Sequence, residues 1–292
     1  MKVRKGLEIT RESWRVLWHD RKLLIFPILS TLSALALIGM LFSAGYLIPE
    51  LGQRVMSFAD PDQQHSPLEQ AVGILCLFVL YFVGWFIAIF FNTALVGCAL
   101  TRFSGGTPTV KGGLQLAVKR LPQILGWSLL TAGVGTLLSA VEQKLGWVGI
   151  IMIRLIGLTW TVATYFVVPL LAAEGVGPVT AVRQSVQLLK KTWGEGLTGN
   201  IAIPLISSGF AILALVFATA GFLAAVFLES LAIAIATGVC LVVSVFLVMV
   251  ISSAMRQVFL AGLYRYAMTG EVPQGFSEAS MKQALSAGKQ PA

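Results

Sequence analysis

Polar side chains inside long apolar runs are the residues of this sequence that could do chemistry. They are Asn92, Arg154, Arg256 and Gln257. A polar group in hydrocarbon is costly, so it marks a candidate ion or solute pathway by default. Arg154 lies roughly 10 Å into its run. There it could contact an anion, snorkel outward or pair with Glu142 or Glu229, and we favour the last two. Asn92 and Gln257 could line a vestibule, but hydrogen bonding between helices is the simpler interpretation.

Motifs that carry catalysis or bind metals are missing from the sequence. The two histidines, His19 and His65, stand apart in regions of different character, and neither belongs to an H-E-x-x-H pattern. There is also no G-x-S-x-G and no phosphate-binding glycine loop. The sequence therefore predicts no catalytic residue, no metal ligand and no cofactor, and we expect a protein that is not an enzyme.

Composition places the chain in a membrane. Of its 292 residues, 57% are hydrophobic and only 12% are charged, with a mean hydropathy of +0.84. Soluble domains average about 25% charged residues. The net charge is +8, and the basic residues that produce it lie between the apolar runs and form no nucleic-acid-binding motif. Membrane topology and anionic lipid headgroups explain it better than nucleic acid does.

Six apolar stretches are long enough to cross the bilayer, which needs about 20 residues each. They are Leu23–Ile48, Ala71–Leu100, Ile124–Val141, Val148–Ala173, Ile201–Leu228 and Leu231–Met255. We expect an all-α polytopic bundle in which the second and sixth helices continue beyond the membrane. Pro169 and Pro204 could break the fourth and fifth helices.

The distribution of basic residues predicts the orientation. Nearly all of the 21 lysines and arginines lie in residues 1–22, in the connections after the second and fourth spans, and in the C-terminal segment. The positive-inside rule then puts both termini in the cytoplasm. The acidic segment Pro49–Gln70 is expected to be an outer loop. We expect an uncleaved multi-pass protein of a cytoplasmic (inner) membrane.

Three amphipathic helices are predicted before the odd-numbered spans, over residues 3–17, 110–121 and 179–193. Apolar residues recur there at steps of three and four, which is one face of an α-helix. The opposite faces are basic, as in helices that lie in a headgroup layer. The residues expected to contact anionic lipid or a partner protein are Arg15, Lys119, Arg120, Arg183, Lys190 and Lys191.

A threefold repeat organises these helices. Gly105, Gly175 and Gly270 are each followed three residues later by a proline, which is typical of a turn that opens a helix. One membrane domain, 1–270, is expected to contain parallel repeats at about 1–103, 104–174 and 175–269. A cytoplasmic tail, 271–292, follows with a short helix at about Phe276–Leu285. In this register Asn92 and Gln257 are equivalent, and the third equivalent residue is Val162.

Two segments resemble a known family. They are L-G-W-S-L-L at 125–130 and the V-V-P, E-G-V-G-P and K-K-T-W-G-E pieces between 167 and 195, and the start SWRVLWHDRKLLIFPILS at 13–30 fits as well. Over roughly 6–270 the chain resembles a prokaryotic six-span family with a domain of unknown function. The resemblance implies a prokaryotic cytoplasmic membrane and no transferable site residues. The repeated unit is distantly similar to the membrane domain of some glycerophosphodiesterases, whose catalytic domain this chain lacks.

Three functions remain open at this point. A non-enzymatic component that organises lipid or partner proteins at the cytoplasmic face leads, and charge reversal at Lys190 and Lys191 would weaken such binding. A transporter or channel for ions or small solutes is the alternative. An intramembrane enzyme is the weakest. A homo-oligomer or a complex with another membrane protein fits each of them.

Overall fold

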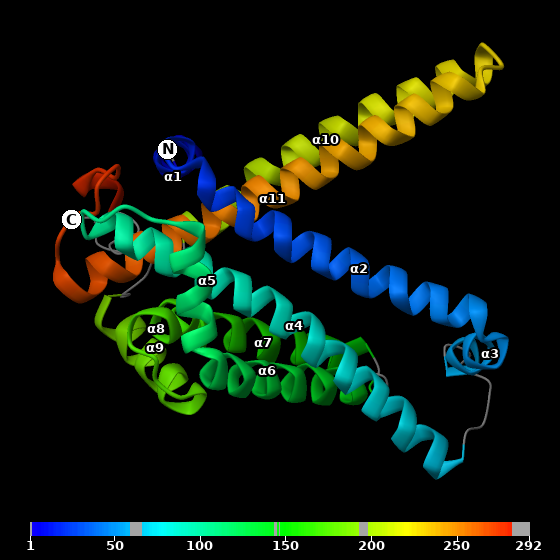
Figure 1. The fold of residues 1–292 in the computed structure, drawn as a ribbon, viewed down its shortest axis with the longest axis horizontal. Helices are drawn as coiled ribbons and strands as arrows, with labels where there is room; N and C mark the ends of the chain where they lie inside the picture. The colour runs from blue at the N-terminus through cyan, green and yellow to red at the C-terminus, as the bar shows by residue number, and fades with distance from the viewer. Residues whose placement is uncertain (1, 59–65, 143–144, 146, 193–197, 282–292) are drawn as a thin grey trace. The chain divides into compact units, whose positions relative to one another are not determined.

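Helices make up almost the whole of the computed structural model, which describes residues 2–58, 66–142, 145, 147–192 and 198–281 (Figure 1). Within these ranges there is no β-strand. The elements are α1 (Lys2–His19), the short 3₁₀ helix η1 (Arg21–Leu24), α2 (Ile25–Leu47), α3 (Pro49–Phe58), α4 (Pro67–Phe103), α5 (Val110–Lys119), α6 (Leu121–Glu142), α7 (Trp147–Ala163), α8 (Val167–Ala173), α9 (Pro178–Thr192), α10 (Thr198–Phe227) and α11 (Leu231–Thr269).

Six segments of the described chain are long and apolar enough to cross a membrane, which confirms the predicted all-α class with six membrane-length segments. They are Arg21–Leu47, Pro67–Phe103, Leu121–Glu142, Gly149–Ala173, Ser207–Phe227 and Leu231–Thr269. α4 and α11 have 37 and 39 residues. At 1.5 Å per residue each is about 55–60 Å long, well beyond the roughly 30 Å of a hydrocarbon core. The predicted helical continuation of these two spans is therefore confirmed.

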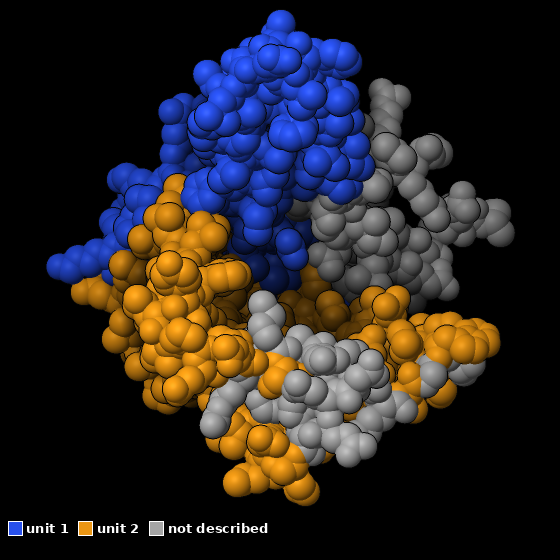
Figure 2. All heavy atoms as spheres, turned by 90° about the vertical axis from the view of Figure 1, so that its right-hand side faces the viewer, with its two compact units in different colours: residues 1–27, 98–112, 188–292 blue, residues 28–97, 113–187 orange. Residues whose placement is uncertain are grey.

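The chain divides into two compact units, coloured separately in Figure 2. Unit 1 comprises residues 1–27, 98–112 and 188–292, and unit 2 comprises residues 28–97 and 113–187. Each unit is therefore assembled from segments that are far apart in the sequence.

In unit 1 the first helix packs on a long hairpin. α10 and α11 run side by side (Figure 1), and α1 contacts both. A Cβ atom on Gly221 of α10 would lie 2.7 Å from Oγ1 of Thr237 on α11, so this glycine lets the two helices approach closely. Ser252 donates a hydrogen bond of 2.5 Å to Ser207 across the same hairpin. Outward-facing side chains of the hairpin are mostly apolar and exposed, as lipid contact requires.

In unit 2, α6 and α7 lie side by side (Figure 1). Trp127 of α6 stacks on Trp160 of α7, with ring centroids 5.9 Å apart. The core contains Ile124, Phe166 and Leu170, each at most 1% exposed. A stacked aromatic pair fixes the register of two helices as well as burying area.

The fourth predicted span is not one continuous helix. It ends as α7 at Ala163, turns at residues 164–166 and resumes as α8 at Val167. Pro169 has no N–H to continue the ladder, and its ring crowds the carbonyl four residues earlier. The backbone N–H of Phe166 donates instead to Oγ of Ser185, at 3.1 Å. Pro204, by contrast, leaves α10 unbroken.

Two segments outside the spans also differ from expectation. Residues 49–58 of the expected outer loop form α3, because Pro49 suits the first helical position and Glu50 suits the positive end of the helix dipole. The predicted helix at Phe276–Leu285 begins at Glu278 and is helical to Met281. The rest of it lies outside the described residues.

Glycines in the left-handed region follow α4, α8 and α11. Gly105, Gly175 and Gly270 have φ of 81°, 67° and 73°. Only glycine adopts this conformation without strain, and it directs the chain away from the helix axis. These are the glycines that the sequence comparison aligned, and each stands where a helix ends.

Candidate functional site

The outer face of α1 is the strongest candidate, and its geometry begins with the opposite, buried face. Ile9, Ser13, Val16 and Leu17 recur at helical spacing, and each is at most 6% exposed. These side chains hold α1 on its neighbours in unit 1 and leave the other face open.

The two acidic side chains nearest the buried face are occupied by the protein. Oε1 of Glu12 accepts a hydrogen bond of 3.2 Å from the backbone N–H of Ser277. Oδ2 of Asp20 lies 3.3 Å from Nε of Arg102. Both carboxylates are thus directed toward unit 1 itself and away from the basic outer face.

Basic residues from the second half of α1, together with Arg21 of η1, line a shallow hollow of about 610 Å³. We call it the α1 hollow. It is lined by Arg11, Trp14, Arg15, Trp18, His19 and Arg21. Three guanidinium groups and an imidazole provide N–H donors, and no carboxylate is among the lining residues.

Stacked rings form part of the α1 hollow. Trp14 and Trp18, one turn apart, stack with centroids 5.2 Å apart and an interplanar angle of 22°. The guanidinium carbon of Arg21 lies 4.2 Å from the ring centroid of Trp18, a cation–π contact. The rings are 38% and 50% exposed. An apolar surface is therefore open beside the cationic groups.

On α5 and α9, basic side chains are open but are not gathered in this way. Lys119, Arg183 and Lys190 are exposed, while Ala117, Ala181, Ser185 and Leu189 face inward. The side chain of Lys191 lies outside the described residues. These helices therefore offer dispersed positive charge on one face.

Arg120 is engaged with the protein. Its Nη2 donates to the carbonyl of Ala173 at 3.2 Å, at the end of α8. A Cβ atom on Gly175 would overlap the guanidinium group. This arginine is packed against the turn after α8, so it supports that turn and is not part of an open basic face.

The four candidate residues inside the spans differ in their exposure and in their partners. Arg154 is exposed, and its Nε is 4.0 Å from Oε1 of Glu142. Asn92 is half-buried in α4, and Arg256 is exposed on α11. Gln257 is 9% exposed, and its Oε1 has no hydrogen-bond partner among the residues that the structure describes. Of these four, only Gln257 is a buried polar group with an unmet acceptor.

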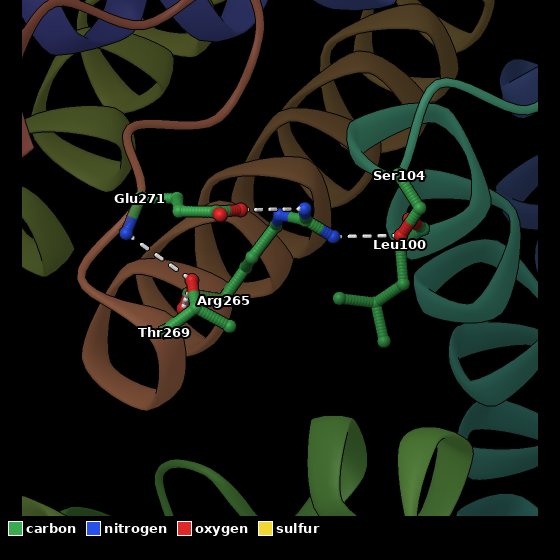
Figure 3. A network of polar contacts seen from close by, with 5 residues as sticks. All are labelled: Leu100, Ser104, Arg265, Thr269 and Glu271. Atoms are coloured by element: carbon green, nitrogen blue, oxygen red, sulfur yellow. Dashed lines mark hydrogen bonds and ion pairs between the residues drawn. The ribbon is translucent and has the colours of Figure 1, made fainter.

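A second polar cluster, in Figure 3, ties the end of α11 to the end of α4 within unit 1. Arg265 donates from Nη1 to Oγ of Ser104 at 2.6 Å and from Nη2 to Glu271 at 3.0 Å. Ser104 in turn donates to the carbonyl of Leu100 at 3.0 Å, and the N–H of Glu271 donates to Thr269 at 3.2 Å. This arginine braces two helix ends.

Sequence reasoning singled out only Arg15 of the residues that line the α1 hollow. The signal for the others was present: Arg11 with Arg15, and Trp14 with Trp18, are four residues apart and share a helix face. The role of Arg265 had no such signal, because Ser104 is 161 residues away.

Fold and spans define the class: a helical protein whose described residues include six segments long and apolar enough to cross a membrane. Residues 71–275 match the model of a family of unknown function, DUF6159, and the chain belongs to this family. A comparison with curated proteins finds no match. The predicted membership of an unknown-function family is thus confirmed, while the prokaryotic origin and the similarity to glycerophosphodiesterase membrane domains stay predictions.

Proposed function

We propose that this protein is a non-enzymatic membrane component that gathers anionic lipid, or a partner protein, at the basic faces of α1, α5 and α9. The observation that carries the proposal is the arrangement of α1. One face of α1 packs on the protein, Glu12 and the neighbouring Asp20 contact the protein, and the arginines and tryptophans of the hollow are open to the surroundings.

The proposal includes a topology. Both termini and the three basic faces would lie on the cytoplasmic side of a prokaryotic inner membrane, as the positive-inside rule requires. Three parallel repeats would bring one basic helix each to that side. The left-handed glycines Gly105, Gly175 and Gly270 support the repeat, since all three end a helix with a similar φ.

Native mass spectrometry of the full chain, gently extracted with its lipids, tests the function. We expect anionic phospholipid to be retained at fixed stoichiometry. The double substitution Arg183→Gln/Lys190→Gln should lower this retention severalfold, because each basic group near an anionic surface contributes about 1 kcal/mol.

The matched control is Arg154→Gln/Arg256→Gln, which removes the same charge from exposed positions within spans. Retention should stay near the wild-type level in this variant. A wild-type chain that carries no lipid, or carries zwitterionic and anionic lipid alike, would contradict the proposal.

A transporter or channel is the second candidate, and Gln257 favours it. A buried amide oxygen without a partner in α11 is a place where water or a solute could bind. The test replaces the three native cysteines and then introduces one at Gln257, Asn92 or Arg154 in turn. Labelling of Gln257→Cys by an aqueous thiol reagent, with Val239→Cys on the exposed surface of α11 protected, would support a hydrated path. Protection at all three sites would contradict a transporter or channel function.

A further inference from the structure

The α1 hollow combines two features that general basic patches lack. Its donor-bearing side chains line one open volume of about 610 Å³, within the ~300–1,000 Å³ of small-ligand sites. Beside those donors stands a stacked pair of indole rings. A ligand that fits must therefore be anionic at one end and apolar next to it.

We propose that the α1 hollow binds the phosphate of one anionic phospholipid, with the rings of Trp14 and Trp18 beside its glycerol and upper acyl carbons. This inference rests on the proposed function and deepens it, because it names one site and one chemical class of lipid. Dispersed charge on α5 and α9 would hold further anionic lipids by charge alone.

Guanidinium chemistry favours a phosphate. Arginine presents planar, paired N–H donors that match phosphate oxygens, and it stays charged on binding. Arg11 and Arg15 are one helical turn apart and have no protein partner among the residues that the structure describes. Arg21 is held over Trp18 and adds charge from a fixed position. Two arginines that have no partner in the described part of the chain, and one held over a ring, thus line the same hollow.

Position in the chain favours a lipid over a soluble phosphate. The α1 hollow reaches Arg21, where the first membrane-length segment, Arg21–Leu47, begins. Half-exposed tryptophans at the end of a span are typical of headgroup depth. A soluble anion would gain nothing from the open rings, whereas a lipid would bury part of them.

The positions of the acidic side chains on α1 and just after it also favour an anionic phospholipid in the hollow. Glu12 and Asp20 contact Ser277 and Arg102 and do not line the hollow. Glu8 is exposed one turn before Arg11 and does not line it either. An anion in the α1 hollow therefore meets donors on its lining and no fixed negative charge.

The experiment is a lipid titration of the purified full chain in detergent, read by native mass spectrometry. The probes are phosphatidylglycerol and phosphatidylcholine with the same acyl chains. We expect the first phosphatidylglycerol to bind the wild type more tightly than phosphatidylcholine does. Arg11→Ala/Arg15→Ala should weaken that binding about 25-fold, at about fivefold for each basic group lost.

Two further variants separate the site from general charge. Arg154→Ala/Arg256→Ala removes equal charge from exposed positions within spans and should leave the first binding constant within about twofold of the wild type, since its groups are outside the hollow. Trp14→Ala/Trp18→Ala should weaken both lipids, because the apolar floor is lost. Unchanged thermal unfolding shows that Arg11→Ala/Arg15→Ala is folded, as expected for exposed side chains.

Several outcomes would overturn the inference. Equal phosphatidylglycerol binding by the wild type and Arg11→Ala/Arg15→Ala would do so while leaving the proposed function intact, because the wild type would still prefer anionic lipid. Displacement of the lipid by inorganic phosphate alone would assign the hollow to a soluble anion. Tighter binding of a polyglutamate peptide would assign it to an acidic protein. Loss of the lipid preference in the wild type itself would instead remove the proposed function.

Discussion

Units 1 and 2 hold their turns with different chemistry. In unit 2 the contacts join no ion pair: Ser185 accepts from the buried backbone N–H of Phe166, and Arg120 donates to the carbonyl of Ala173 beside the turn at Gly175. In unit 1 they are charged and nearer to solvent, where Arg265 joins Ser104 and Glu271. The difference predicts that substitutions in the turns of unit 2 lower the free energy of unfolding strongly and equally at all salt concentrations. Substitutions in the turns of unit 1 should lower it less, by an amount that depends on salt.

The largest effect is expected from Gly175→Ala in unit 2. A left-handed φ costs a non-glycine residue about 1–2 kcal/mol, and the new Cβ would also overlap the guanidinium of Arg120. Displacing that group removes its hydrogen bond to Ala173. We expect a loss of about 3 kcal/mol in the free energy of unfolding, measured by denaturant titration in mixed micelles.

Gly270→Ala in unit 1 is the matched control. Its φ is 73°, and no atom lies within 4 Å of the position that a Cβ would take. Only backbone strain remains, about 1 kcal/mol. Equal losses for the two variants would show that Arg120 does not support the turn after α8.

Ser185→Ala should have the next largest effect. Ser185 is 0% exposed, and its Oγ accepts a hydrogen bond from the buried N–H of Phe166 at the break between α7 and α8. Leaving a buried donor unpaired costs about 1–3 kcal/mol. We expect a loss of about 2 kcal/mol that is the same at low and high salt. A Ser185→Thr variant keeps the acceptor and should recover part of it.

The spans were predictable from the sequence because hydrophobic length is a strong local signal. Every predicted run is helical in the described chain, although the fourth is divided into α7 and α8. The break at Phe166 was only half visible: Pro169 indicated it, but its stability depends on Ser185, 19 residues later. α3 was missed because its apolar and polar residues lack the length of a span and were taken for a loop.

The site was less predictable than the spans. Helical periodicity identified Arg15 and the basic faces, since positions on one helix follow from spacing alone. It could not separate Arg120, which packs on Gly175, from Lys119, which is exposed. That distinction depends on contacts 53 residues apart in the chain. The same limit concealed the pairing of Glu12 with Ser277, which leaves the α1 hollow without a carboxylate in its lining.

Arg265→Ala tests unit 1, in which substitutions are expected to lower the free energy of unfolding less. It removes a hydrogen bond to Ser104 and an ion pair to Glu271, which is 69% exposed. Partial exposure limits the loss to about 1 kcal/mol in the free energy of unfolding. Raising the salt concentration should reduce the difference in the free energy of unfolding between Arg265→Ala and the wild type. Arg265→Lys keeps the charge but lacks the paired donors that contact both partners. Its free energy of unfolding should therefore lie between those of the wild type and Arg265→Ala.

The smallest effect is expected from Glu12→Ala, and it should be local. The carboxylate accepts from the N–H of Ser277, the residue before the helical turn at 278–281. An exposed hydrogen bond of this kind contributes about 0.5 kcal/mol, so hydrogen exchange at the Ser277 amide should speed up by about twofold to threefold. Glu8→Ala removes an exposed carboxylate from the same helix and should leave this amide unchanged. If both variants left it unchanged, the acid on α1 would be free to face the basic surface, and the separation of charge on which the α1 hollow depends would be lost.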